Sequence, residues 1–397
     1  MKYILAIDQS TSSTKTMLFD ENAILVARES IDHKQFFPQS GWVEHNPSEI
    51  LDNTYLSVKS LLEKSKIDPR SITSIAITNQ RETVVVWDKR TGKPIYNAIV
   101  WQCNRGAKIC QDLIMRGYES SVIQKTGLIL NPYFSASGVK WILDNVEGAA
   151  GASREGHLLL GTMDTWLIWN LTSGKVHATD YTNASRTLLF NLHTLNWDPE
   201  LLALFTIPSS MMPNVMPCDG LYGTTMMNGL LPEVPIAGVL GDSHGALVGQ
   251  MCFSRGMGKA TYGTGSSIAV NIGEQPLSPP RGLVTSVGFA AKGKVFYEYE
   301  GNIHCTGATI KWLQDDLQLI NSAEETEALA VSVGSSDGVY FVPAFAGLGA
   351  PWWDPDAKAL ICGMNRGSTK AHMVRAALES IAFQVKDLMA LIQESGV

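Results

Sequence analysis

The segment ILAIDQSTSSTKTMLFD, residues 4–20, reads as two strands joined by a turn rich in hydroxyl groups. A second segment, KATYGTGSSIAVNIG at residues 259–273, repeats this layout with a turn of small residues. Backbone N–H groups and hydroxyls in such turns can approach an anion closely. Two matching turns far apart in the chain therefore predict a nucleotide held by two halves of one protein.

Neither turn fits a P-loop, which requires G-x-x-x-x-G-K-[ST] leading into a helix. Here Lys15 instead opens a second strand, TMLFD, and a third strand, AILVARES, follows a short turn at residues 20–22. The sequence thus favours a meander of strands around the first turn over a strand–loop–helix unit.

The composition limits the class of protein. With 397 residues, the chain is long enough for two or three domains with a large core. Its net charge of -7 argues against a nucleic-acid surface, so any phosphate site must be local. The first apolar run ends at Asp8, too short for a signal peptide, and no apolar stretch reaches membrane-spanning length. We expect a cytoplasmic protein that binds neither nucleic acid nor membrane.

Six cysteines are scattered without a C-x-x-C pair, which predicts neither a zinc site nor a disulfide framework. Strands are expected at 72–79, 83–88 and 236–242. Apolar residues recur at helical spacing in 48–66, 105–116, 136–145, 302–317 and 370–395. The stretch 158–172 mixes both signals, and the proline-rich stretch 199–235 is typical of loops approaching a domain boundary. We place that boundary between residues 245 and 246.

Two carboxylates follow strand patterns beside the hydroxyl turns. Asp8 lies at the mouth of the first turn, and Asp242 ends the strand IAGVLGD. An isolated Asp at a strand end is more often a turn cap. The paired occurrence favours chemistry instead, because phosphoryl transfer needs a carboxylate near magnesium and a base for the acceptor hydroxyl.

Other candidates are weaker when taken alone. Arg81 and Glu82 stand between two strands, where an ion pair and a polyol contact are equally natural. Trp101 and Tyr133 could form an apolar wall for a carbohydrate, although aromatic residues at such positions are more often core. The loop GLGAPWWDPDA at 347–357 reads either as a packed turn or as the rim of a sugar site.

Taken together, six ordered motifs resemble the FGGY carbohydrate kinases, and among them the glycerol kinases. They are DQSTSSTK, NQRET with VWQCNR, NPYFSASGVKWILDN, GDSHGALVGQ, TYGTGS and ALICGMNRGSTKAHMVRAALES. The resemblance covers essentially the whole chain. It implies an α/β fold of two ribonuclease-H-like, actin-like ATPase lobes with a cleft between them. Residues 1–245 would form the N-terminal lobe for polyol and phosphate, and residues 246–397 the C-terminal lobe for nucleotide.

The resemblance also implies roles for individual residues. Asp242 would be the catalytic base, and Asp8 with Asp242 would hold Mg²⁺. The polyol would contact Arg81, Glu82, Trp101, Tyr133, Asp242 and Ser243. ATP would contact Ser12, Ser13, Lys15, Gly263, Thr264, Gly265, Gly307 and Lys311. The implied reaction transfers a phosphoryl group from ATP to a primary hydroxyl, with glycerol as the first expected acceptor.

This sequence departs from the family pattern at four positions. Ser243 and Ser267 stand where glycerol kinases usually have Gln and Phe, which predicts a wider and more polar pocket. Erythritol, ribitol or xylulose then become rival substrates. Ser10 replaces the usual loop Gly, and Gly138 replaces a usual Lys, which affects local geometry.

Family members typically continue into a Gly-rich segment and a following Asn that complete the adenine pocket. From the sequence we therefore expect a truncated second lobe with incomplete adenosine recognition. Two alternatives follow from the residues: an actin-like ATPase of chaperone type, and a non-catalytic polyol-binding protein. The residues expected to contact a polyol, Arg81, Glu82, Trp101 and Tyr133, argue against the ATPase. The only protein partner expected is a second copy of the chain, in a homodimer.

Overall fold

The computed structural model describes residues 1–345, 347–354 and 356–397 and divides the chain into two units. The first unit comprises Met1–Gly245 and Ser286–Tyr297, and the second comprises Ala246–Thr285 and Glu298–Val397. The sequence had placed residues 286–297 in the second lobe. In the structure this hairpin tip bonds within the first unit, where the Val287 N–H donates to Ser185 Oγ and the Ala290 carbonyl accepts from the Cys218 N–H.

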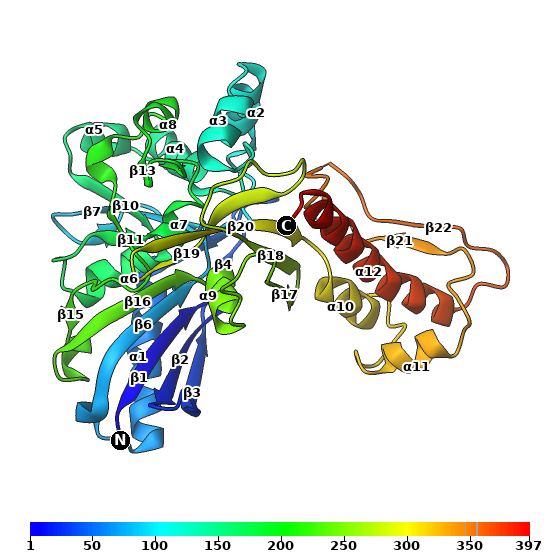
Figure 1. The fold of residues 1–397 in the computed structure, drawn as a ribbon, viewed down its shortest axis with the longest axis horizontal. Coiled ribbons are helices and arrows are strands. Elements are labelled where there is room, and N and C mark those ends of the chain that lie inside the picture. Colours follow the sequence, from blue (N-terminus) through cyan, green and yellow to red (C-terminus); the bar gives the residue numbers. More distant parts are fainter. Residues whose placement is uncertain (346, 355) are drawn as a thin grey trace. The chain divides into compact units, whose positions relative to one another are not determined.

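A six-stranded mixed sheet forms the centre of the first unit (Figure 1). Its order is β15 (Thr224–Thr225), β16 (Val234–Gly241), β6 (Ile72–Asn79), β1 (Tyr3–Gln9), β2 (Ser13–Asp20) and β3 (Leu25–Asp32). Strands β1, β6 and β16 run parallel, whereas β2 and β3 continue antiparallel from β1. The predicted meander around the first turn is therefore confirmed as one half of this sheet.

The carboxyl ends of the three parallel strands meet at one edge of the sheet. Gln9 at the end of β1 is opposite Asn79 at the end of β6, and Asn79 is in turn opposite Gly241 at the end of β16. Residues next to these ends are thereby brought together although they are far apart in the sequence. Figure 1 shows the three strands side by side.

Alternating burial along the strands builds the core of this unit. Leu5 and Ile7 of β1 and Ile75 and Ile77 of β6 are buried together. Helix α1 (Pro47–Ser65) packs over β2 and β3, and it begins where the Asn46 side chain accepts the backbone N–H groups of Ser48 and Glu49. The amphipathic pattern predicted for residues 48–66 is thus confirmed.

A second sheet in the same unit contains β10 (Leu158–Thr162), β7 (Val84–Asp88), β9 (Ala98–Ile99), β5 (Glu44–His45) and β4 (Gln35–Phe36), with β8 (Lys93–Pro94) paired to β7. The ambiguous stretch 158–172 resolves into β10 followed directly by helix α6 (Met163–Leu171). Both signals were therefore real, and they belong to consecutive elements.

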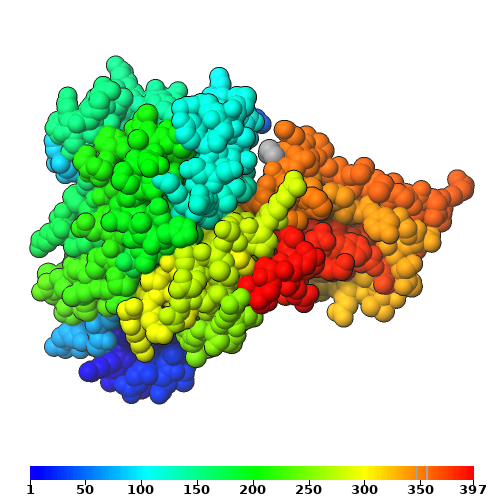
Figure 2. All heavy atoms as spheres, turned by 45° about the horizontal axis from the view of Figure 1, so that its top comes forward, coloured from blue at the N-terminus to red at the C-terminus, as the bar shows by residue number. Residues whose placement is uncertain are grey.

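The remaining helices of the first unit lie around these sheets. Helices α2 (Ala107–Met115) and α3 (Glu119–Thr126) form the cyan surface in Figure 2. The unit also holds α4 (Ser135–Asn145), α5 (Ala149–Arg154), α7 (Tyr181–Ala184), α8 (Pro199–Leu204), β11 (Ala178–Asp180), β12 (Phe190–Asn191), β13 (Asn196–Trp197), β14 (Asn214–Met216), η1 (Pro69–Ser71), η2 (Ser209–Met211) and η3 (Met227–Gly229). Helix α9 (Asp242–Gly249) begins in this unit, and its residues from Ala246 onward belong to the second unit.

The second unit contains β17 (Gly258–Tyr262) and β18 (Ser266–Gly273), which belong to a sheet of order β17-β18-β20-β19. Of the other two strands, β19 (Val284–Ala291) and β20 (Lys294–Ile303), residues 284–285 and 298–303 belong to the second unit. Helix α12 (Lys370–Glu394) packs against α11 (Glu325–Val331), α10 (Gly307–Asp315) and β21 (Tyr340–Val342), which pairs with β22 (Leu360–Cys362). The helix predicted over 302–317 is too long. Residues 302 and 303 belong to β20, and α10 begins only at Gly307.

All six cysteines are free thiols, and five of them are buried while Cys362 is exposed. Within the described part of the chain, no helix combines the length and apolar character needed to cross a membrane.

Candidate active site

Asp8 lies on β1 one residue before the strand ends, next to Lys15 of β2 in the antiparallel register. The Lys15 ammonium donates to Asp8 Oδ2 at 3.3 Å. Burial raises the pKa of Asp8 above its usual value, against the lowering effect of Lys15, and the negative charge of Asp242 adds to the rise. Of these causes, burial is the largest and the charge of Asp242 the smallest.

Asp242 follows β16 and is the first residue of α9. Its Oδ1 lies 3.3 Å from Arg81 Nε and also accepts the Ser243 backbone N–H at 2.7 Å. The Arg81 side chain is 5% exposed, but that of Asp242 is 43% exposed. A buried guanidinium thus holds a carboxylate that remains open to a ligand.

Gly241 makes this ion pair possible. A Cβ at position 241 would lie 2.6 Å from Arg81 Cγ and 3.0 Å from His244 Nδ1. Contacts as short as the first do not occur between real side-chain carbons. Any larger residue before Asp242 would therefore displace the stem of Arg81.

Glu82 is buried with a φ of 61°, which is uncommon for a residue other than glycine. The Thr83 N–H donates to the Arg81 carbonyl across it at 2.6 Å, so the chain makes a tight reversal after β6. The Glu82 carboxylate accepts from Arg186 Nε at 2.6 Å. Both side chains of this ion pair are almost completely buried.

The two predicted aromatic residues lie together. The ring centroids of Trp101 and Tyr133 are 5.4 Å apart, and the Arg186 guanidinium lies 6.0 Å from the Tyr133 ring. Trp101 Nε1 donates to Thr11 Oγ1 in the first hydroxyl turn at 3.0 Å. A continuous set of contacts therefore joins Glu82, Arg186, Tyr133, Trp101 and this turn.

The sequence did not single out Arg186 or Thr11 as partners. Arg186 ends the polar run TDYTNASR at 179–186, and such a run between apolar segments is the signal that could have marked it. The loop that carries Trp101 is held by Arg105, whose guanidinium lies 4.1 Å from the Trp42 ring and 4.7 Å from the Trp141 ring. Arg105 also pairs with buried Glu44 at 2.7 Å.

The first hydroxyl turn closes on itself. Both the backbone N–H and the hydroxyl of Ser10 donate to the Ser13 carbonyl at 2.9 Å. The Ser12 carbonyl accepts the His33 N–H at 3.1 Å, and the Ser13 side chain is buried. Serine at position 10 thus contributes a bond to the turn, in place of the glycine expected there.

The second hydroxyl turn is built into the start of α10. The N–H groups of Gly307 and Ala308 donate to the carbonyls of Gly263 and Thr264 at 2.9 and 3.0 Å. A Cβ on Gly265 would lie 2.6 Å from the Ile303 carbonyl, and one on Gly307 would lie 2.5 Å from the Gly263 carbonyl. Four of the predicted nucleotide residues are therefore brought together, whereas Lys311 is exposed one helical turn further and lies 3.9 Å from Asp315.

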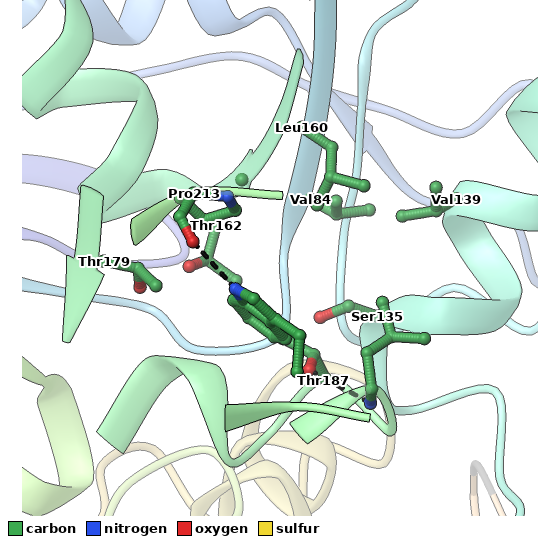
Figure 3. Close-up of a pocket in the computed structure, with 11 residues that line it drawn as sticks. Val84, Ser135, Val139, Leu160, Thr162, Thr179, Thr187 and Pro213 are labelled. Carbon is green, nitrogen blue, oxygen red and sulfur yellow. Dashed lines mark hydrogen bonds between the residues drawn. The ribbon is translucent and has the colours of Figure 1, made fainter. Parts of the chain in front are cut away.

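A small cavity in the first unit is separate from these residues (Figure 3). Its lining includes Val84, Leu160, Thr162, Thr179 and Pro213, and none of the predicted site residues. A water molecule's centre can occupy only about 10 Å³ of it, which is roughly one water. It is too small for a polyol and is a feature of the core.

Comparison with known proteins identifies the family. Residues 3–249 match the N-terminal domain, and residues 258–397 the C-terminal domain, of the FGGY family of carbohydrate kinases. The chain belongs to this family of carbohydrate kinases. Its resemblance in sequence motifs and its two-unit α/β fold are thereby confirmed.

Relatives within the FGGY family include proteins named glycerol kinase. Glycerol kinase 2 of Thermotoga maritima is 50% identical over 396 residues, which cover 100% of this chain and 80% of that protein. The crystal structure of Plasmodium falciparum glycerol kinase with ADP matches with a TM-score of 0.91 and 37% identity, over 99% of this chain and 79% of that one. A ligand-bound xylulose kinase from Lactobacillus acidophilus, at 24% identity and a TM-score of 0.87, shares the fold.

As an FGGY carbohydrate kinase, the chain is a phosphotransferase that acts on an alcohol group with ATP. The C-terminal domain match covers residues 258–397, the chain spans about 80% of the length of the glycerol kinases it matches, and no comparison supports the predicted truncation of the second lobe. It stays a prediction.

The structure shows the surroundings of two more of the four departures from the family pattern. A Cβ at Gly138 would lie 3.3 Å from Ile99 and 3.5 Å from Val84, so α4 packs there too closely for a long side chain. Ser267 Oγ donates to Glu300 at 2.7 Å and accepts from Lys259 Nζ at 3.0 Å. Its hydroxyl is therefore engaged within the second unit, which weakens the expectation that it serves a polyol.

Proposed function

We propose that this FGGY kinase transfers the terminal phosphoryl group of ATP to a primary hydroxyl of glycerol. The observation that carries the proposal is the half-exposed carboxylate of Asp242, held by buried Arg81 at the edge where three parallel strands end. The identity with proteins named glycerol kinase supports glycerol as the acceptor.

In this proposal Asp242 is the general base. It accepts the proton of the polyol hydroxyl while the hydroxyl oxygen bonds to the terminal phosphorus of ATP and the bond to the bridging oxygen breaks. ADP leaves with that electron pair. Arg81 orients the Asp242 carboxylate through its Nε, which contacts Oδ1. The other carboxylate oxygen is thereby left for the substrate.

The polyol is assigned to the neighbouring side chains of the first unit. Arg81 and Glu82 supply charged hydrogen-bonding groups, and the Trp101 and Tyr133 rings supply an apolar wall for the carbon chain. Ser243 lies beside Asp242 and completes this set.

Magnesium is assigned to Asp8 and Asp242. Mg²⁺ prefers carboxylate oxygens and needs only one or two of them when substrate phosphates and water complete its coordination. Asp8 lies near the end of β1 and Asp242 directly follows β16, at the sheet edge where these strands end, which fits that requirement. Among the described residues no group of three or more His, Cys, Asp and Glu could hold a metal. Bound there, the ion would neutralise charge on the phosphates.

Nucleotide contacts are assigned to the two hydroxyl turns, with Ser12, Ser13 and Lys15 in the first unit and Gly263, Thr264, Gly265, Gly307 and Lys311 in the second. Because the reaction consumes ATP, we place it in the cytoplasm. A homodimer is the expected assembly, and sedimentation would measure it.

A longer polyol or a ketose is the second candidate acceptor. The small side chain of Ser243 after Asp242 favours it, because it leaves more room than the Gln expected at that position. Erythritol, ribitol and xylulose therefore belong in the same test as glycerol.

The test is an ADP-release assay with ATP, Mg²⁺ and each acceptor in turn. We expect glycerol to raise ADP release above the rate without acceptor, with a smaller kcat/KM for the longer compounds. If a longer compound gave the highest kcat/KM, that compound would replace glycerol as the proposed acceptor. ADP release that no polyol changes would leave an ATPase, and polyol binding by calorimetry without turnover would leave a non-catalytic binding protein.

A further inference from the structure

A short buried segment lies behind the candidate active site in the first unit. Asp180 ends β11, and helix α7 follows it directly. The Asp180 side chain is fully buried and accepts the backbone N–H groups of Thr182 and Asn183 at 2.8 and 3.0 Å. Such a cap stabilises a helix start. Here the side chains of Thr182 and Asn183 also form hydrogen bonds with residues at the ends of two other strands.

The first extension reaches the residue before Asp242. Thr182 Oγ1 donates to Asp180 Oδ2 at 2.6 Å and accepts the Gly241 N–H at 2.9 Å. A hydroxyl has a single proton, so the bond to the carboxylate directs its lone pairs toward Gly241. The N–H of the residue before the candidate base is therefore held by a charge-assisted chain of two hydrogen bonds.

The second extension reaches the strand that leads to Arg81. Asn183 Nδ2 donates to Asp180 Oδ1 at 2.9 Å and to Asn79 Oδ1 at 3.0 Å. Asn79 Nδ2 returns a bond to Asn183 Oδ1 at 3.0 Å and also donates to the Gln80 carbonyl at 2.9 Å. This fixes the orientation of both amides and the path of the chain just before Arg81.

We propose that Asp180 is a positioning residue that sets the placement of Asp242 relative to Arg81. Asp180, Thr182 and Asn183 are called the Asp180 clamp below. The inference rests on the proposed function, since it concerns the geometry of the proposed base. One buried carboxylate orders both strand ends, because each of its oxygens holds one of the two side chains that reach β16 and β6.

The chain offers a matched control in Asp198. Asp198 is also buried and begins a short helix, α8, where its Oδ1 accepts the N–H groups of Glu200 and Leu201 at 2.9 and 3.1 Å. The Asp198 carboxylate also accepts from the side chains of Asn191 and Lys125. It therefore shares the burial and the helix cap of Asp180, but none of these partners is a site residue.

The first experiment compares Asp180→Asn with Asp198→Asn, using whichever acceptor the wild type turns over fastest and normalising rates to folded protein by circular dichroism. We expect kcat to fall about tenfold or more in Asp180→Asn, since small displacements of a catalytic group have large rate effects. Asp198→Asn should keep kcat within about twofold of the wild type. Equal kcat values in the two folded variants would overturn the proposal.

The second experiment works even if Asp180→Asn fails to fold. Thr182→Val keeps the shape but removes the hydroxyl, whereas Thr182→Ser keeps the hydroxyl. We expect Thr182→Val to lower kcat about tenfold while changing the polyol KM less than about threefold, and Thr182→Ser to restore most of kcat. A full kcat in Thr182→Val, or equal losses in both variants, would overturn the clamp.

The wild-type rate separates this proposal from the one on which it rests. A wild type that turns over none of the acceptors overturns the proposed function. A wild type with normal turnover, together with unchanged kcat in Thr182→Val, overturns only the role of the clamp.

Discussion

The two units carry their hydroxyl-rich turns in different ways. In the first unit the functional groups are side chains, which emerge from the ends of three parallel strands and are joined by ion pairs and ring contacts. In the second unit the turn is backbone, closed by carbonyls of Gly263 and Thr264 that accept the first N–H groups of α10. The first unit is therefore sensitive to the chemistry of its side chains, and the second to added volume.

This difference follows from local packing. Arg81, Glu82 and Arg186 are buried and charged, so each needs its partner in place. Gly265 and Gly307 instead lie where a methyl group would collide with a carbonyl oxygen. Substitutions that remove charge should therefore have their largest effects in the first unit, and substitutions that add volume should have theirs in the second.

The largest effect is expected for Asp242→Asn. The amide keeps the shape and can still contact Arg81, but it cannot accept the proton of the acceptor hydroxyl. We expect kcat to fall by roughly 10²–10⁴ with a much smaller change in the polyol KM. Steady-state ADP release measures both quantities. Full turnover in this variant would remove Asp242 from its proposed role.

The next effect concerns a buried carboxyl of the first unit. Burial, together with the charge of Asp180, raises the pKa of Asp164 to about 7. An unfolded Asp ionises near pH ~3.9. Between these values the unfolded chain binds fewer protons than the folded one, so this carboxyl makes the free energy of unfolding fall as pH rises from about 4 to about 7.

Asp164→Asn should remove that fall. We expect the free energy of unfolding of the variant minus that of the wild type to increase by about 1–4 kcal/mol when the pH is raised from 4.5 to 7.5. Urea denaturation followed by tryptophan fluorescence at both pH values measures it. Parallel pH profiles for the two proteins would show that this side chain does not titrate in that window.

Much of the first unit could be predicted from the sequence, because strand ends are local signals and parallel strands bring them together. Asp8, Arg81 and Asp242 were expected for this reason. Arg186 was not, because its partner Glu82 is 104 positions away and no local pattern specifies that ion pair. The need for glycine at 241 depends on the path of the Arg81 stem, which becomes visible only in three dimensions.

The second unit was less predictable for a related reason. The residues of β20 before α10 continue an apolar pattern that also suits a helix, so the helix was extended back to residue 302. The hydrogen bonds that end the strand and start the helix come from Gly263 and Thr264, about forty residues earlier in the sequence. Periodicity within one segment cannot reveal a boundary set by another segment.

For the second unit we predict that Gly307→Ala destabilises the turn. The added Cβ would lie 2.5 Å from the Gly263 carbonyl oxygen, whereas a Cβ at Gly334 in the same unit would meet nothing within 4 Å. We expect Gly307→Ala to cost ~1–3 kcal/mol of stability and to raise the KM for ATP. Gly334→Ala is the control and should change neither. Thermal unfolding and ATP titration of the rate provide the measurements, and equal behaviour of the two variants would contradict a backbone-built turn.

The smallest effect is expected for Lys311→Ala, which asks whether any side chain of the second unit matters to the nucleotide. Lys311 is 79% exposed, and its contact with Asp315 at 3.9 Å is too solvated to stabilise the fold, so unfolding should change by less than ~0.5 kcal/mol. If its charge contacts the phosphates, the KM for ATP should rise by up to about fivefold, and the rise should shrink at high salt. Lys386→Ala, at an exposed lysine of α12, is the matched control. A KM equal to that of the control would leave the second unit's nucleotide contacts to its backbone alone and make the contrast between the two units complete.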